Sequence, residues 1–180
     1  MKSFLSIALV LFLSLTVLAQ PYKKGDMIGQ VGIGYGHAGI YGDMDFPPIS
    51  LGFQYGIEEK ISIGGVVGFS SSSDSWGDDD YGWEYTYTYI FVGARGEYHF
   101  WQNENIDAYG GVTLGYDIVS SSVESHGSGS HYSWSGSASG SYALWGFHVG
   151  GRYYFNPSVA AFAELGYGVS YITAGVAFKL

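Results

Sequence analysis

Eight ionisable residues are spaced so that β-strands would bring them into one polar interior. They lie on the polar phase of segments whose other phase is apolar. Because alternate side chains of a strand point to the same face, all eight would meet on one side of a sheet. The eight are Arg95, Glu97, Asp107, Asp117, His148, Arg152, Glu164 and Lys179. They predict a cluster of ion pairs that fills and rigidifies the interior, and a path for protons or ions is the functional alternative.

A second set of residues lies in an acidic and aromatic segment. Its candidate contacts for a cation or a partner are Asp74, Trp76, Asp78, Asp79, Asp80 and Trp83. Clustered carboxylates could hold Ca²⁺, or divalent ions shared with lipopolysaccharide. The spacing lacks the glycine at the sixth position of the standard calcium loop, so a solvated acidic loop is favoured and no metal site is predicted. The aromatic residues could contact a protein or glycan, although an interfacial girdle is the favoured interpretation.

A third set holds the atoms of a hydrolase. Glu124, His126, Ser128, His131 and Ser133 offer an acid, a base and a nucleophile, as an enzyme acting on lipid A would need. Nucleophilic catalysis requires these groups within hydrogen-bond reach and rigidly held. This stretch is rich in Ser and Gly, so the same residue types would lie close together by composition alone. We therefore predict no enzymatic activity and no cofactor.

Length, charge and cysteine content narrow the class of protein. The chain has 180 residues and no cysteine, which excludes disulfides and thiol chemistry. Residues 1–19 have a positive start, an apolar run and a small residue at Ala19, as signal peptides do. The run is shorter than the roughly 20 residues of a spanning helix. Residues 20–180 would form one domain, and their excess of acidic over basic residues argues against nucleic-acid binding.

The chain after residue 19 alternates between large apolar and small or polar residues, most clearly over 49–57. The expected strands are about 27–36, 49–57, 61–70, 84–100, 106–119, 142–155, 159–168 and 171–180. Long connections are expected at 37–47, 71–83 and 120–139, and short ones at 58–60, 101–105 and 156–158. The alternation slips near Tyr89–Val92, for which a β-bulge is one explanation.

The direction of the apolar face decides between two kinds of β-protein. A soluble sandwich or a lipocalin-like barrel would point this face inward. The interior of an eight-stranded barrel is only just wide enough for side chains, and inward Phe, Tyr, Trp and Ile from every strand would crowd it. An apolar outer face without charges, strands of about 10 residues, and alternating short and long connections are typical of membrane barrels. The prediction is therefore an all-β, eight-stranded, antiparallel, up-and-down transmembrane β-barrel.

Several short motifs carry a family resemblance across the mature chain. They are Gly93–Phe100, Asp107–Gly111, Gly115–Tyr116, Ala163–Gly168 and Gly175–Leu180. The chain resembles the small outer-membrane β-barrel proteins common in Bacteroidetes, and its fold is similar to the OmpX and OmpA-barrel type. The resemblance implies a bacterial outer-membrane protein and supplies no established activity.

The function expected from the sequence is non-enzymatic. A barrel with a plugged polar lumen would have a structural or surface-interaction role through its outer loops. A narrow channel or transporter for small solutes is the alternative. The expected partners are outer-membrane lipid, lipopolysaccharide and an extracellular protein or glycan, and the expected state is a monomer.

Overall fold

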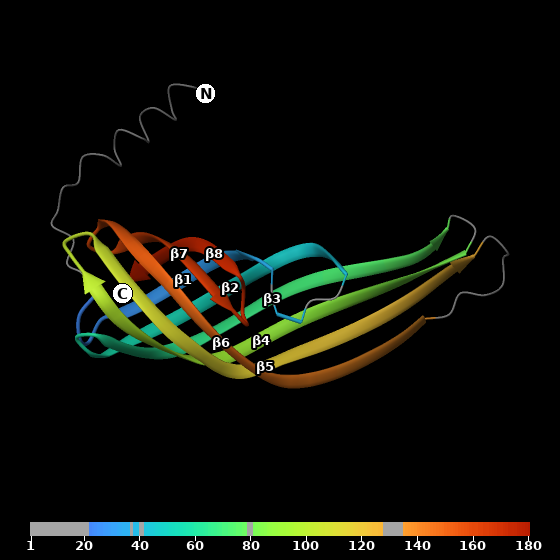
Figure 1. The fold of residues 1–180 in the computed structure, drawn as a ribbon, viewed down its shortest axis with the longest axis horizontal. Helices are drawn as coiled ribbons and strands as arrows, with labels where there is room; N and C mark the ends of the chain where they lie inside the picture. The colour runs from blue at the N-terminus through green and yellow to red at the C-terminus, as the bar shows by residue number, and fades with distance from the viewer. Residues whose placement is uncertain (1–21, 37, 40–41, 79–80, 128–134) are drawn as a thin grey trace, which may run out of the picture.

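Eight antiparallel strands form a closed ring in the computed structural model, which describes residues 22–36, 38–39, 42–78, 81–127 and 135–180. The strands are β1 (Met27–Tyr35), β2 (Asp43–Glu58), β3 (Ile61–Asp78), β4 (Tyr81–Gln102), β5 (Ile106–Gly127), β6 (Ser135–Asn156), β7 (Val159–Tyr167) and β8 (Ile172–Lys179). Each strand pairs with the next, and β1 also pairs with β8, so the ring closes (Figure 1). The predicted up-and-down barrel is confirmed. The predicted signal peptide lies outside the described residues.

The outer wall of the barrel is apolar. Leu114 and Trp145 are 65% and 59% exposed, whereas Asp107 and Arg152 on the same two strands are buried inside. From Ile90 to Phe100 the outward positions of β4 carry only apolar or small side chains. A soluble core would have covered these residues, and lipid covers them in a transmembrane barrel. Among the described residues, no α-helix has the length and apolar character needed to cross a membrane.

Four strands continue far beyond the wall. The predicted loops at 71–83 and 120–139 are wrong, because β3 and β4 pair as far as Asp78 and Tyr81, and β5 and β6 as far as Glu124 and Ser135. Figure 1 shows these strands extending to one side of the barrel, away from the short β1, β7 and β8. A regular backbone ladder holds these Ser- and Gly-rich segments extended, since pairing and context outweigh β-propensity.

The change from lipid to water explains the slip in the alternation of β4. The pairing of β4 with β3 and β5 is unbroken through Tyr89–Val92, so the expected bulge is absent there, and the register shift lies at His99–Trp101. The outward side chains change instead. Phe69, Ile90 and Ile118 lie in one row of the ladder, and two residues farther out the row is Ser71, Thr88, Ser120 and Ser139.

This second row is called the boundary row below, because the apolar outer wall ends there. The four-stranded part that starts at the boundary row, residues 71–78, 81–88, 120–127 and 135–139, is called the protruding sheet. Its outer face is polar, which is the composition expected where water replaces hydrocarbon.

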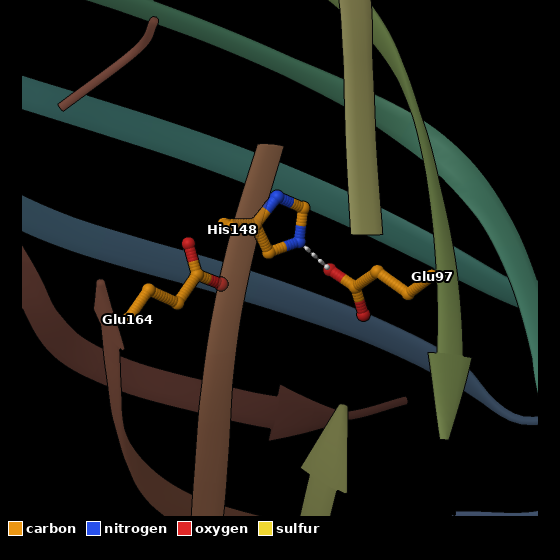
Figure 2. Close-up of side chains that lie close together, drawn as sticks. All are labelled: Glu97, His148 and Glu164. Carbon is orange, nitrogen blue, oxygen red and sulfur yellow. Dashed lines mark ion pairs between the residues drawn. The ribbon is translucent and has the colours of Figure 1, made fainter. Parts of the chain in front are cut away.

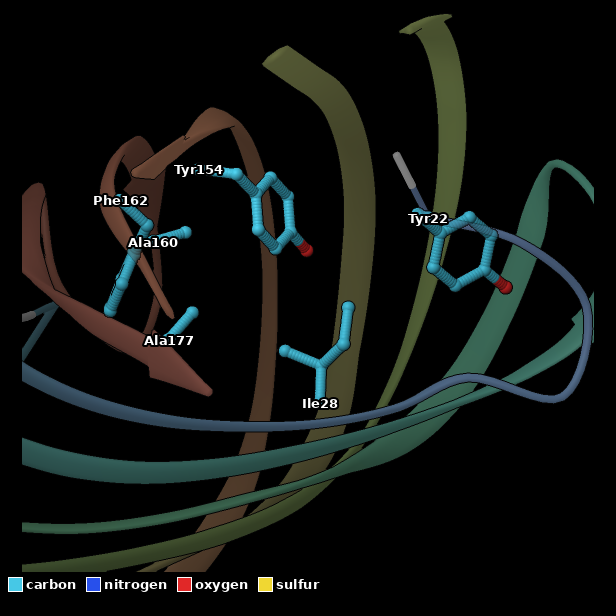
Figure 3. Close-up of a cluster of buried hydrophobic side chains, with 6 residues drawn as sticks. All are labelled: Tyr22, Ile28, Tyr154, Ala160, Phe162 and Ala177. Atoms are coloured by element: carbon cyan, nitrogen blue, oxygen red, sulfur yellow. The ribbon is translucent and has the colours of Figure 1, made fainter. Parts of the chain in front are cut away.

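The opposite end of the barrel is closed by an apolar cluster. It consists of Tyr22, Ile28, Tyr154, Ala160, Phe162 and Ala177. Figure 3 shows these side chains pointing into one space from β1, β6, β7, β8 and the segment before β1. The ring of Tyr22 stacks on His99 with 3.6 Å between ring centroids, and its hydroxyl donates to the Ile61 carbonyl oxygen at 2.6 Å. The chain therefore folds back into the barrel before β1 begins.

Candidate functional site

The barrel interior is organised around Arg152 on β6, whose side chain is 1% exposed. Its Nη1 donates to Asp107 Oδ2 and its Nη2 to Glu97 Oε2, both at 2.9 Å. Nη2 also lies 3.3 Å from Gln30 Oε1. The guanidinium carbon sits 3.9 Å from the centroid of the Tyr109 ring. One arginine therefore connects β1, β4, β5 and β6 across the lumen through charge-assisted hydrogen bonds.

A second arginine extends this network toward β7. Arg95 Nη1 donates to Glu164 at 3.1 and 3.2 Å and lies 3.7 Å from Glu97 Oε1. The Tyr109 hydroxyl donates to Glu164 Oε1 at 2.8 Å. Glu97 contacts both arginines, and Tyr109 contacts Arg152 and the Arg95 partner Glu164, so the two halves form one network.

Two histidines border the same network. His99 Nδ1 lies 2.7 Å from Asp107 Oδ1, and its Nε2 lies 3.1 Å from Ser62 Oγ. His148 Nε2 lies 3.4 Å from Glu97 Oε1. The two guanidinium groups face three carboxylates, from Glu97, Asp107 and Glu164.

The structure brings six of the eight interior candidates together and places the other two elsewhere. Asp117 lies nearer the protruding sheet, where Tyr142 donates its hydroxyl to Asp117 Oδ2 at 2.9 Å. Lys179 is bound to Asp26 at 2.6 Å near the closed end. Network members that the sequence analysis did not select are His99, Gln30, Gln54, Ser62 and Tyr109. All five lie on the inner phase of their strands, so a search for every polar residue on that phase, and not only for part of the ionisable ones, would have found them.

Three of these residues have the donor set of a metal site. Figure 2 shows His148 between Glu97 and Glu164, and one ligand atom from each lies within 4.8 Å of the others. Both carboxylates already accept hydrogen bonds from protein side chains. Arg95 donates to Glu164, and Gln54 Nε2 donates to Glu97 Oε1 at 2.9 Å. A divalent ion would have to displace a guanidinium group from this position. The chemistry of this cluster therefore favours ion pairing over metal binding.

The space left inside the network is small. A cavity of about 20 Å³ lies beside Arg95, His148 and Glu164. A volume of this size holds about one water molecule. Packing of this kind favours a filled interior over a wide aqueous channel.

The predicted acidic and aromatic contacts lie at the far end of the protruding sheet. Trp76 is 82% exposed and lies opposite Trp83 in the ladder. This pair is seven residues beyond Phe69 and Ile90, roughly 20 Å along the strand. Both tryptophans lie beyond the boundary row, where the apolar outer wall ends, so this position favours contact with water over the predicted interfacial girdle. Asp74 is exposed on β3, the side chain of Asp78 is not described, and Asp79 and Asp80 lie outside the described residues.

The hydrolase candidates are not assembled into a site by the described residues. Glu124 is exposed on β5 and lies opposite Glu84 of β4. The side chain of His126 is not described, and Ser128, His131 and Ser133 lie outside the described residues.

Known structures with a similar fold are small membrane barrels. The N-terminal β-barrel domain of Pseudomonas aeruginosa OprF aligns with 87% of this chain and 98% of its own, at 12% identity and a TM-score of 0.52. A de novo designed transmembrane β-barrel (16% identity, 88% and 98% coverage, TM-score 0.49) and the Yersinia pestis protein Ail (16%, 89% and 98%, 0.48) score lower. At 12% identity the OprF similarity supports the fold alone.

The sequence comparisons add no relative. No family model matches the chain, and no curated protein matches it. The predicted relationship to the Bacteroidetes barrels therefore stays a prediction.

Proposed function

We propose that this protein is a non-enzymatic bacterial outer-membrane barrel, exported by residues 1–19, that contacts a partner outside the cell through its protruding sheet. The observation that carries the proposal is strand length. β4, β5 and β6 have 22 residues each, about twice the roughly 10 that a tilted strand needs to cross a bilayer. The remainder stands beyond the boundary row, where it adds nothing to the membrane span.

The two sides of the protruding sheet differ in how their backbone edges are protected. On the β2 side, Pro47 and Pro48 and two register shifts interrupt the ladder near the edge. On the β6 side, residues 135–146 pair with β5, and β7 pairs with β6 only from Phe147 onward. That segment contains no proline and no charged residue. Because edge strands usually carry such protection, an unprotected edge favours the addition of an extended partner segment.

The edge is tested by selecting extended peptides from a displayed library against the detergent-solubilised protein. We expect binders that lose affinity when Ser139→Lys places a charge on the β6 edge. Asp45→Lys on the protected β2 side is the matched control and should leave binding unchanged. Binders equally insensitive to both substitutions would contradict a role for the β6 edge.

The interior network supports a sealed barrel over the narrow channel that the sequence left as the alternative. We expect no steady conductance when the purified protein is inserted into planar bilayers. Large, stable single-channel steps would refute the sealed lumen and favour solute transport.

A further inference from the structure

A cavity lined by tyrosines lies at the base of the protruding sheet, over the mouth of the barrel. Its volume is about 490 Å³, within the range of small-molecule sites. Its lining residues are Gly39, Tyr87, Tyr89, Val119, Gly140, Ser141 and Tyr142. Among these described residues none is basic.

The cavity exists because residues smaller than tyrosine lie beside the tyrosines on the inner face. Tyr89, Val119 and Gly140 form one row across β4, β5 and β6. A Cβ at Gly140 would meet no atom within 4 Å, so the space next to it is open. Gly39 closes the cavity beside Tyr142, because a Cβ at Gly39 would lie 3.0 Å from the Tyr142 hydroxyl. The site is therefore bounded by tyrosine side chains above a floor of small residues.

The side chains around this cavity differ from those of the barrel below it. There the outer face is apolar, and the inner face carries the buried apolar side chains of Val66, Phe91 and Leu144, followed by the charged network. At and above it, the inner face carries Tyr87, Tyr89 and Val119, and the outer face carries Thr88 and Ser120. The tyrosines consequently face the mouth of the barrel and not the lipid, so a ligand would reach them from the water outside.

The charge around the cavity has one sign. The Lys and Arg residues that follow residue 19 are Lys23, Lys24, Lys60, Arg95, Arg152 and Lys179, and none belongs to the protruding sheet. The protruding sheet carries Asp74, Asp78, Glu84 and Glu124. Tyr142 itself donates its hydroxyl to the carboxylate of Asp117, which makes its ring richer in electrons. A field of one sign concentrates ions of the opposite sign near the site.

We propose that this tyrosine-lined cavity binds a small organic cation, an ammonium or quaternary ammonium group on a compact apolar body, from the medium outside the cell. Faces of tyrosine rings attract such cations, and cages of aromatic residues are a recurring way to recognise quaternary ammonium groups. The acidic sheet would raise the local concentration of the ligand. The site rests on the proposed orientation in the membrane. It shares Gly140, Ser141 and Tyr142 with the β6 edge segment but does not need an added strand there.

The proposal is tested by calorimetric titration of choline into the protein in a maltoside detergent, since amine-oxide and choline-headed detergents carry the same kind of cation. The neutral isostere 3,3-dimethylbutanol has the shape of choline without its charge. We expect choline to bind about tenfold more tightly than the isostere, and its affinity to fall as salt is added. Equal affinity for the two compounds, or no heat with choline, would overturn the proposal.

Two test substitutions and one control distinguish binding in the cavity from a general effect of surface charge. Gly140→Leu should fill the open space and abolish choline binding without lowering thermal stability. Ser139→Leu, on the neighbouring residue that faces the other way, should leave the affinity unchanged. Tyr87→Leu should keep the apolar volume and weaken choline about fivefold while sparing the isostere. Choline binding that survives Gly140→Leu would overturn the assigned site, and the peptide selection on the β6 edge would remain a separate test of the proposed function.

Discussion

The barrel interior and the protruding sheet are formed by the same strands and have opposite side-chain chemistry. Inside the barrel, Arg152 and Arg95 are each held by carboxylates, and the cavity beside Arg95 has room for about one water molecule. Around the mouth the inner face is tyrosine-rich, the charges of the sheet are acidic, and a cavity of about 490 Å³ stays open. The strand alternation continues through both regions, so the difference comes from what lies outside the wall.

Because the outer wall of the barrel faces hydrocarbon, charged side chains in this region are found in the interior. Buried charges need partners, and the network supplies them from β4, β5, β6 and β7. Water on both sides of the protruding sheet removes that constraint. The inner face there is free to carry aromatic residues, which favours stability as the role of the first region and recognition as the role of the second.

The largest effect should come from breaking the interior network. Arg152→Met removes the guanidinium group that bonds to both Glu97 and Asp107, and these two carboxylates stay buried with less positive charge beside them. We expect a loss of about 3–5 kcal/mol in the free energy of unfolding, measured by thermal unfolding in detergent. Choline binding at the mouth should persist at temperatures where the variant is folded.

A compensating variant sharpens this prediction. Adding Glu97→Gln and Asp107→Asn to Arg152→Met removes the uncompensated charge, and part of the lost stability should return. An Arg152→Met protein as stable as the wild type would mean that the ion pairs do not rigidify the barrel.

Glycine substitutions in the two regions should change the free energy of unfolding by different amounts, with a smaller effect than Arg152→Met. A Cβ at Gly115, in the barrel wall, would collide with the Val92 carbonyl oxygen, whereas at Gly140 it would meet nothing within 4 Å. Gly115→Ala should therefore cost about 1–3 kcal/mol through overpacking. Gly140→Ala should be neutral or stabilising by about 0.5 kcal/mol, since glycine in a strand carries excess chain entropy. Equal unfolding temperatures for both variants would show that the wall is no more tightly packed than the sheet.

The sequence was sufficient to predict the barrel but not the protruding sheet. Alternation over segments such as 49–57 predicted eight strands because lipid outside and polar groups inside impose that pattern on every strand. Residues 71–78 and 120–127 have the Ser, Gly and Asp content of loops. Their strand structure depends on ladder hydrogen bonds with partners distant in the chain, which local composition does not reveal.

The sequence predicted which residues face the barrel interior, but not how deep along the barrel axis each of them lies. Alternation assigns Asp117 and Lys179 to the inner phase together with Arg95 and Arg152. It does not say how far along the axis each lies, because depth depends on the tilt and stagger of the closed barrel. The tyrosine-lined cavity was missed for a related reason, since it needs Tyr89, Val119 and Gly140 to share a row across three strands.

The smallest effect concerns the closed end of the barrel. There the Tyr22 side chain fills the interior, whereas the cavity at the opposite end, the mouth, is open. Burial away from water, followed by the nearby Asp107 and Asp26 carboxylates, raises the pKa of Tyr22 from 10.0 to about 12. The neutral phenol therefore contributes stability that is fully present below pH 10 and is lost as the pH rises through about 12. Tyr22→Phe should be less stable by about 1 kcal/mol at pH 8, because it lacks the hydrogen bond to the Ile61 carbonyl. Melting temperatures of the two proteins measured from pH 8 to 12 should then converge, because only the wild type has a phenol at this position to ionise. Parallel curves over that range would show that the closed end gains nothing from a neutral Tyr22.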